Sequence, residues 1–502
     1  MIRNKTFELT LRGPEPAVPA RADLYADFTE PDGAVRTVRG FYAGDGVYKV
    51  RYLPQKAGPV RYAVRGVLSA RGEEECSDSA ERGIVRAKGT HFEDADGKCF
   101  LPFGTTVYAL FHQEEERITE TLETLRNSPF NKVRTCVFPK SYDYNHNDPE
   151  LYPFERDADG NWVPERPCCA FWDHIERVLA SLSEAGIETD LILFHPYDRW
   201  GFASMTREQN LLYLDYLLAR LSAIPGIWWS LANEFDLVFS KTEEDWHAIE
   251  EHVARNDPYG HLLSCHNCFS FYDFHRKNIT HCSIQTTRLE WARLFQEEYG
   301  KPVVFDECCY EGNLSDAWGN ISGFEMANRF CMACVGGAYA THGEVFLSDD
   351  EVLWWSKGGK LKGESPARIA YLKKILERLP HPLEEWKNDP FAGMDPVKAE
   401  SVRNSPFLRL QAGLNETERA VFLMKQIRIR ARSGEKCFLE YFARHCCAEA
   451  AWILPEEGSY EIYAIDIWEM TCRKIAEDAH GTMKLSLPGK EGILAVGVRR
   501  EG

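Results

Sequence analysis

Strand-like and helix-like segments alternate along the chain from about residue 90 to about residue 345. Eight short apolar segments, each a candidate strand, are separated by segments whose apolar residues recur at helical spacing. The segment beginning TREQ carries a helix start signal, because Thr206 and Gln209 have the spacing of a capping box. Since eight such units close most naturally into a ring of parallel strands surrounded by helices, the pattern predicts a (β/α)8 TIM barrel.

The chain on either side of this region has the two-residue alternation of antiparallel strands. Tyr48, Val50 and Tyr52 alternate with basic residues, and short alternating segments return after Pro380. We therefore predict an α/β protein with three domains, for which the chain of 502 residues is long enough. These are an N-terminal Ig-like β-sandwich over residues 1–88, the (β/α)8 barrel over residues 89–388 and a C-terminal β-sandwich over residues 389–502.

The charge of the chain limits its partners. A net charge of −18 argues against nucleic acid and anionic membranes, both of which favour basic surfaces. The N-terminal stretch MIRNKTFELTLRG lacks the apolar core of a signal peptide, and no apolar run reaches membrane-spanning length. We expect a cytoplasmic protein that acts on a neutral partner.

Sixteen cysteines raise the question of a zinc site. Two CxxC pairs are present, Cys265 with Cys268 and Cys331 with Cys334. The second pair lies in FCMACVGG, which reads as a packed helix end, and reduced cysteine commonly serves as a small buried apolar residue. We therefore expect neither a metal nor a cofactor.

Polar and aromatic side chains gather where the candidate strands end. In a barrel these ends meet at one face, which is where active sites of such barrels lie. The candidate site residues are Arg134 after strand two, His195 and Asp198 after strand three, Asn233 and Glu234 after strand four, His266 after strand five, Gln285 after strand six, Glu307 and Tyr310 after strand seven, His342 after strand eight, and Trp355 as a platform for a sugar ring.

Successive side chains of a strand point to opposite faces, and this alternation indicates which of two neighbouring acids faces the barrel interior. Glu234 lies at a spacing of two residues from the small residues Ser230 and Ala232, so its side chain is expected on the same face of the strand. Small residues suit the crowded barrel axis, which makes this the inner face. Glu307 has the parity of Phe305, so Asp306 is expected to face the helix layer. Two glutamates on opposite strands at one mouth are what glycoside cleavage needs, one as a proton donor and one as a nucleophile.

The segments WWSLANE and KPVVFDE resemble the strand-four Asn-Glu and strand-seven Glu of glycoside hydrolase clan A. The resemblance implies that Glu234 is the acid/base, that Asn233 binds the sugar 2-hydroxyl and that Glu307 is the nucleophile of a retaining mechanism. The whole layout resembles bacterial apiosidase-like proteins with domains of unknown function 5060 and 5605. Clan members usually carry an aromatic residue at strand six and Trp at strand eight, where this chain has Gln285 and His342.

The function expected from these features is a retaining, exo-acting glycosidase with a small glycoside or oligosaccharide as substrate. The long loop between Phe138 and Phe171 is expected to roof the pocket, and the sandwiches to brace the barrel or to form a homo-oligomer interface. Two alternatives remain open: a non-catalytic carbohydrate-binding scaffold, and a metal-dependent barrel hydrolase that uses His195, His266, His342 and Asp306.

Overall fold

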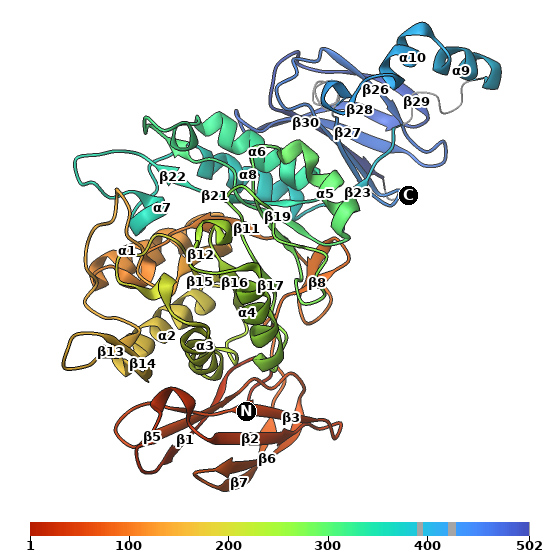
Figure 1. The fold of residues 1–502 in the computed structure, drawn as a ribbon. Helices are drawn as coiled ribbons and strands as arrows, with labels where there is room; N and C mark the ends of the chain where they lie inside the picture. Colours follow the sequence, from red (N-terminus) through yellow and green to blue (C-terminus); the bar gives the residue numbers. More distant parts are fainter. Residues whose placement is uncertain (389–394, 420–427, 501–502) are drawn as a thin grey trace. The chain divides into compact units, whose positions relative to one another are not determined.

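The computed structural model describes residues 1–388, 395–419 and 428–500, and Figure 1 shows its ribbon. The chain divides into two compact units. The first consists of residues 1–287, 298–322 and 339–363, and the second of residues 288–297, 323–338 and the chain from residue 364. The predicted three-domain boundaries stay a prediction, and residue 389, the predicted start of the last domain, lies outside the described residues.

The N-terminal strands form two antiparallel sheets, in the orders β1-β5-β4 and β3-β2-β6-β7. Phe28 of one sheet stacks on Tyr52 of the other at 4.1 Å between ring centroids, so the two sheets share a core. This arrangement confirms the predicted antiparallel N-terminal region. Its strands are β1 (Phe7–Arg12), β2 (Leu24–Thr29), β3 (Val35–Arg39), β4 (Phe41–Tyr42), β5 (Val47–Tyr52), β6 (Gly58–Gly66) and β7 (Ala70–Cys76).

A small antiparallel sheet closes the N-terminal end of the barrel. It contains β8 (Arg86–Lys88), β9 (His91–Glu93) and β10 (Cys99–Phe100). Phe92 packs at 5.0 Å from Trp228 and 5.2 Å from Tyr339, which lie near the beginnings of two barrel strands. A pocket that enters the barrel interior can therefore open only at the opposite end.

Eight parallel strands form the barrel in the order β17-β16-β15-β12-β11-β21-β19-β18. A bridge between His266 and Ser283 joins the two outer strands of this order, so the ring is nearly closed. The predicted (β/α)8 fold is confirmed. The strands are β11 (Phe103–Thr106), β12 (Lys132–Cys136), β15 (Glu188–Phe194), β16 (Ile227–Ala232), β17 (Leu263–Ser264), β18 (Cys282–Gln285), β19 (Val303–Glu307) and β21 (Tyr339–His342).

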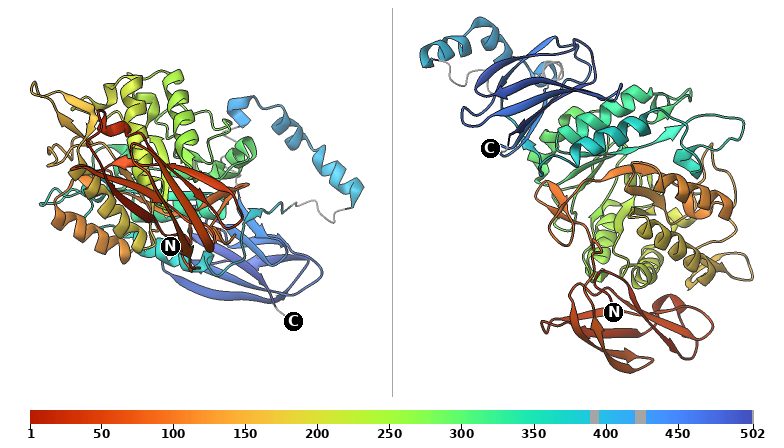
Figure 2. Two further views of the ribbon diagram at one scale, coloured as in Figure 1. Left: turned by 90° about the horizontal axis from the view of Figure 1, so that it is seen from below. Right: turned by 180° about the vertical axis from the view of Figure 1, so that it is seen from behind.

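Helices follow the barrel strands in the chain, and Figure 2 shows α1 to α4, in orange to green, on the outside of the strands. Helix α3 begins with the predicted capping box: Gln209 N donates to Thr206 Oγ1 at 3.3 Å, and Thr206 N donates to Gln209 Oε1 at 3.0 Å. The helices are α1 (Glu115–Arg126), α2 (Cys169–Glu184), α3 (Arg207–Leu221), α4 (Glu243–Asn256), α5 (Ala292–Tyr299), α6 (Gly323–Val335), α7 (Trp354–Lys357) and α8 (Ser365–Leu376).

Two pairs of short strands lie in the loops at the C-terminal end of the barrel. The long loop predicted to roof the site contains the hairpin β13 (Phe154–Arg156) and β14 (Trp162–Pro167). The loops after β19 and β21 pair in parallel through β20 (Glu311–Gly312) and β22 (Glu344–Val345). The second pair thus brings together two loops that are separated in the chain.

The barrel interior below its mouth is charged and buried. Lys132 Nζ lies 2.5 Å from Asp306 Oδ1 and 2.7 Å from Asp190 Oδ2, and Arg134 lies beside them. Ser283 and Thr341 hydroxyls also donate to the Asp306 carboxylate, at 2.6 and 2.8 Å. The Asp306 side chain therefore points into the barrel, and the expectation that it faces the helix layer is wrong.

Val304, two residues before Asp306, packs with Trp228 in the barrel interior, so ordinary alternation turns Asp306 inward. A β-bulge then lets Glu307 face inward as well. Ile284 of β18 pairs with Phe305, but the next residue, Gln285, pairs with Glu307, so Asp306 is an extra residue in β19. The bulge breaks the strict alternation on which the parity argument rests. As a result, Asp306 and Glu307 both face the inside, one in the barrel and the other at its mouth.

The C-terminal strands form a six-stranded antiparallel sheet and an antiparallel pair, β26 with β29. Trp452 of β26 packs at 4.9 Å against Trp386 and donates its indole N–H to Glu440 of β25 at 2.8 Å. The elements are β23 (Glu384–Glu385), α9 (Pro396–Arg403), α10 (Pro406–Ala412), β24 (Ile429–Ser433), β25 (Cys437–Tyr441), β26 (Glu449–Ile453), β27 (Tyr460–Asp466), β28 (Thr471–Ala479), β29 (Thr482–Ser486) and β30 (Ile493–Arg499).

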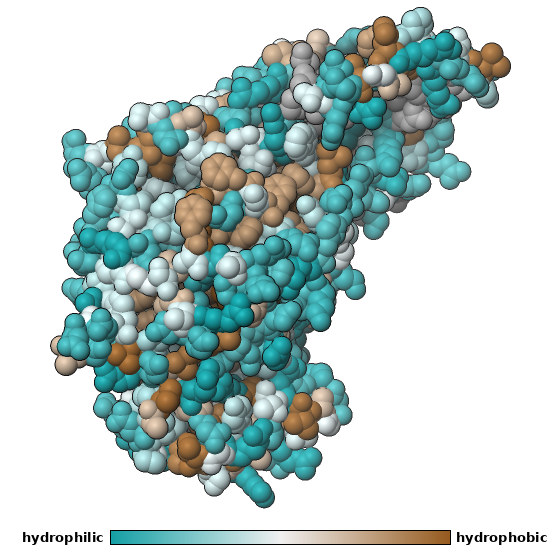
Figure 3. Space-filling model, viewed as in Figure 1, coloured by the Kyte–Doolittle hydropathy of each residue, from teal (hydrophilic) through white to brown (hydrophobic). Residues whose placement is uncertain are grey.

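One face of the molecule is mainly polar. Hydrophilic side chains, in teal, predominate on the face shown in Figure 3, with a group of apolar residues near the middle of the view. Among the residues that the structure describes, no helix has both the length and the apolar character needed to cross a bilayer.

Candidate active site

A pocket of about 720 Å³ opens at the C-terminal ends of the barrel strands. Both predicted glutamates, from β16 and β19, line it. The remaining walls come largely from aromatic residues and from the loops after β12, β19 and β21. The lining residues are Tyr108, Lys140, Ser141, Tyr142, Asp143, Tyr144, Tyr197, Glu234, Gln285, Glu307, Tyr310, Leu314, Ser315, Asp316, Trp318, Gly319, Val345 and Trp355.

Donors surround the Glu307 carboxylate, which is 4% exposed. The Tyr310 hydroxyl donates to Oε2 at 2.5 Å, and the Tyr108 hydroxyl donates to Oε1. Arg134 Nη1 lies 3.5 Å from Oε1. Two phenols and a guanidinium aimed at one carboxylate stabilise its negative charge and fix its orientation.

Glu234 has a different environment. Burial and the negative charge of Glu307 raise the pKa of the Glu234 carboxyl. Its Oε2 accepts a hydrogen bond from the Tyr197 hydroxyl at 2.5 Å and one from Asn233 Nδ2 at 3.0 Å. The two glutamates at this mouth thus differ in environment: hydrogen-bond donors surround Glu307, whereas burial and a neighbouring carboxylate favour the protonated form of Glu234.

Left-handed backbone conformations occur at both strand ends. Glu234 has φ of +52° and Cys309 has φ of +66°, values that non-glycine residues rarely adopt. Just after Cys309, the Tyr310 side chain points back to Glu307, to which its hydroxyl donates. Backbone strain of this kind costs about 1–3 kcal/mol at each position and is concentrated at functional sites.

Lys140 sits among the aromatic rings of the pocket wall. Its Nζ lies 3.3 Å from the ring centroid of Tyr108 and 4.2 Å from that of Tyr197. Burial lowers the pKa of the Lys140 ammonium, while its charge opposes the rise in the pKa of Glu234. Lys140 therefore helps to set the proton affinity of Glu234.

The structure brings together seven of the predicted site residues. Gln285, Tyr310 and Trp355 line the pocket with the two glutamates. Asn233 and Arg134 contact each other behind them, with Arg134 Nη2 3.2 Å from Asn233 Oδ1.

Four further predicted residues, like Asn233 and Arg134, do not line the pocket. His195 Nε2 lies 3.2 Å from the Phe138 carbonyl, and Asp198 caps the backbone N–H groups of Trp200 and Ala203 at 2.8 and 2.6 Å. The remaining two are buried histidines: Nδ1 of His266 lies 3.4 Å from the Glu234 backbone nitrogen, and the ring of His342 stacks on Phe130 at 4.8 Å.

The sequence-based metal alternatives are not assembled in the described residues. His195, His266, His342 and Asp306 do not form a common group of ligands there, nor do the CxxC pairs, and none of the sixteen cysteines, all of them in the described residues, forms a disulfide. A different cluster, of Glu311, His342 and Glu344, does bring three ligand atoms together.

Three residues that shape the site, Tyr108, Lys140 and Tyr197, lie at strand ends in the sequence but were not among the predicted site residues. All three follow barrel strands, so their position was the available signal. Their residue types do not distinguish a pocket wall from ordinary packing, and their roles depend on contacts between loops far apart in the chain.

Solved structures show which class of protein has this fold. A provisionally named glycoside hydrolase from Bacteroides vulgatus ATCC 8482 aligns with a TM-score of 0.86 and 31% identity, covering 99% of each chain. A glycoside hydrolase of family 5 from the same organism aligns with a TM-score of 0.60 and 14% identity, covering 83% of this chain and 93% of its own. A third structure, named glycoside hydrolase, gives 0.58 and 13%, covering 83% and 97%. The fold is thus that of glycoside hydrolases.

The family can be stated more closely. The profile "Apiosidase-like, catalytic domain" matches residues 86–380, more than half of the chain, so the chain belongs to the Apiosidase-like family. The domains of unknown function DUF5060 and DUF5605 match residues 3–66 and 427–499. No curated protein matches the chain.

Proposed function

We propose that this protein is a retaining glycoside hydrolase with Glu307 as nucleophile and Glu234 as acid/base. The observation that carries the proposal is the pair of buried carboxyl groups in one pocket with different environments: the pKa of Glu234 is raised, and two phenols and a guanidinium surround Glu307. Family membership and the 31% identical glycoside hydrolase support the same reaction class.

In the first step, a Glu307 oxygen attacks the anomeric carbon while the bond to the leaving group breaks. Glu234 gives its proton to the leaving oxygen, so that a neutral alcohol departs and a glycosyl ester remains on Glu307. In the second step, Glu234 takes a proton from water, which attacks the same carbon and displaces Glu307. Two inversions give net retention.

The surrounding residues have supporting roles in this proposal. Tyr108, Tyr310 and Arg134 hold the nucleophile in its charged form and orient it. Asn233, whose Nδ2 donates to Glu234, binds the sugar 2-hydroxyl in this proposal. Trp355 offers an apolar face to the sugar ring, and Gln285 a polar group at the pocket wall.

The substrate in this proposal is a small glycoside or an oligosaccharide cleaved from its end. Lys140 to Tyr144, the beginning of the long loop, line one wall, and Ser315 to Gly319 line another. Walls built by loops on separate strands favour a closed pocket over an open cleft for a polymer. A cytoplasmic location is part of the proposal and rests on the sequence alone.

A panel of 4-nitrophenyl glycosides, including pentosides and a β-apioside, tests the reaction class. We expect release of nitrophenol from at least one member, and proton NMR of the first product should show the anomeric configuration of the substrate. A first product of inverted configuration would contradict the double displacement. A protein that binds members of the panel without cleaving any would favour the carbohydrate-binding scaffold.

Substitution of Lys140 tests the control of the acid. Glu234 must be protonated to donate, so the alkaline limb of kcat/KM against pH reports its pKa in the free enzyme. Because the Lys140 charge lowers that pKa, we expect Lys140→Met to move the alkaline limb to higher pH. Lys140→Arg retains the charge and should leave the limb near its original position. A limb that does not move in Lys140→Met would contradict this role.

A further inference from the structure

A buried cluster outside the catalytic pair joins the loops after β19 and β21. Glu311 and Glu344 are paired neighbours across the short parallel strands β20 and β22, and His342 ends β21. Their exposures are 1%, 1% and 0%. Two carboxyl groups at such depth repel each other if both are ionised, and the low dielectric of the interior makes that repulsion costly.

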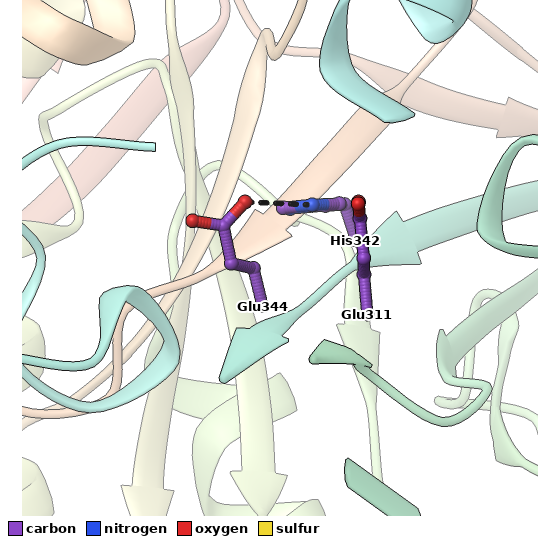
Figure 4. A group of neighbouring side chains, drawn as sticks. All are labelled: Glu311, His342 and Glu344. Carbon is purple, nitrogen blue, oxygen red and sulfur yellow. Dashed lines mark ion pairs between the residues drawn. The ribbon is translucent and has the colours of Figure 1, made fainter. Parts of the chain in front are cut away.

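The three side chains converge on one point. One ligand atom from each lies within 4.8 Å of the other two. His342 Nε2 is fully buried, has no hydrogen-bond partner and lies 3.9 Å from Glu344 Oε2. Figure 4 shows the imidazole and the Glu344 carboxylate pointing toward one another, with Glu311 beside the imidazole.

We propose that Glu311, His342 and Glu344 bind one divalent metal ion of the Zn²⁺ or Mn²⁺ class. One neutral imidazole and two carboxylates suit these ions, whereas Ca²⁺ and Mg²⁺ favour oxygen ligands alone. The ligand atoms now lie up to 4.8 Å apart, and half of that distance is longer than a metal–ligand bond of about 2.0–2.2 Å. The side chains would therefore move slightly inward when the ion binds. The positive charge would remove the repulsion between the carboxylates.

Hydrogen-bond partners hold the candidate ligands in position, as such partners commonly do around a bound metal ion. His342 Nδ1 lies 3.1 Å from Thr105 Oγ1, which also accepts the indole N–H of Trp354 at 2.8 Å. An Nδ1–H donated to Thr105 leaves the lone pair of Nε2 directed at the two carboxylates. Glu344 Oε2 is in turn held by the Gly363 backbone N–H at 2.8 Å.

Gly363 also leaves the room that the cluster needs. A Cβ at this position would lie 2.5 Å from Glu311 Oε2 and 2.6 Å from Glu344 Oε2. Any larger residue would push the two carboxylates apart. The close approach of the backbone is therefore a part of the site.

The ion would have a structural role. Glu311 adjoins Tyr310, whose hydroxyl donates to Glu307, so a cation bridging β20 and β22 would fix the segment that carries this tyrosine. The proposal differs from the expectation of no metal that the sequence gives. That expectation rested on cysteine spacing and on strand ends, and Glu311 and Glu344 meet only through the pairing of two loops.

Metal binding by the full chain tests this proposal independently of catalysis. The protein is dialysed against EDTA, freed of the chelator and titrated with Zn²⁺ or Mn²⁺ in competition with a chromophoric chelator, and its metal content is measured by elemental analysis. We expect one equivalent of tightly held ion, and a midpoint of thermal unfolding that rises with metal concentration.

His342→Gln and Glu344→Gln should each lower the affinity for this metal ion by at least about tenfold. His281→Gln is the matched control, because His281 is also buried and its Nδ1 also lies beside a threonine hydroxyl, at 3.0 Å; it should keep the equivalent. Glu311→Gln provides a further test if His342→Gln does not fold. Equal stoichiometry and affinity of metal binding in the wild type and all ligand variants would overturn the proposal. A wild-type protein that binds no metal ion tightly would also overturn it, and would indicate that a shared proton, not a metal ion, joins the two carboxyl groups.

Discussion

Glu307→Ala is expected to lower kcat on the best aryl glycoside of the panel by about 10⁴-fold or more. The substitution removes the atom that forms the covalent bond to the sugar. Tyr108, Tyr310 and Arg134 would remain as donors around the space it leaves. Azide is small enough to enter this space, and we expect it to restore part of the rate and to give a glycosyl azide of inverted configuration.

The control for this experiment is Glu150→Ala, which truncates an exposed glutamate in the long loop. Its kcat should stay within a few-fold of the wild type. Circular dichroism of both variants should match the wild type, so that loss of activity is not loss of fold. A Glu307→Ala variant that retains wild-type kcat without azide would remove Glu307 from the reaction.

Lys132→Met is expected to be the most destabilising single change considered. The Lys132 ammonium is fully buried and lies 2.5 Å from Asp306 and 2.7 Å from Asp190. Methionine fills similar volume but leaves the two buried carboxylates with less compensating charge. Breaking a buried ion pair from one side costs about 3–5 kcal/mol, and we expect a loss of that size in the free energy of unfolding measured with urea.

Lys484→Met serves as the comparison, because Lys484 and Glu449 form an exposed ion pair at 2.5 Å, with side-chain exposures of 67% and 61%. Water and salt screen such a pair, so its removal should change stability little. If Lys132→Met unfolds at the same urea concentration as the wild type, the buried cluster does not stabilise the barrel in the way described.

The barrel could be predicted because its signals are local. Each strand shows as an apolar run and each helix as a periodic segment, and the capping box at Thr206 formed as its spacing indicated. Strand ends also gave the right region for the site, since parallel strands deliver their carboxyl ends to one face.

The orientation of individual side chains was less predictable. Asp306 and Glu307 both face inward because a bulge, which depends on the pairing of β19 with β18, interrupts the alternation between them. His195 and His266 end or follow strands as well, yet they pack behind the pocket wall. Position in a strand tells which residues reach the mouth of the barrel, but the contacts between loops decide which of them face the pocket.

The most direct test of the account is to trap the covalent intermediate. The wild-type protein is incubated with the 2-deoxy-2-fluoro analogue of its best aryl glycoside, carrying a good leaving group, and is then digested and analysed by mass spectrometry. The account predicts one added sugar on the peptide that contains Glu307, attached at that side chain. A sugar attached to a different residue, or an active enzyme that releases the inverted anomer and carries no label, would contradict it.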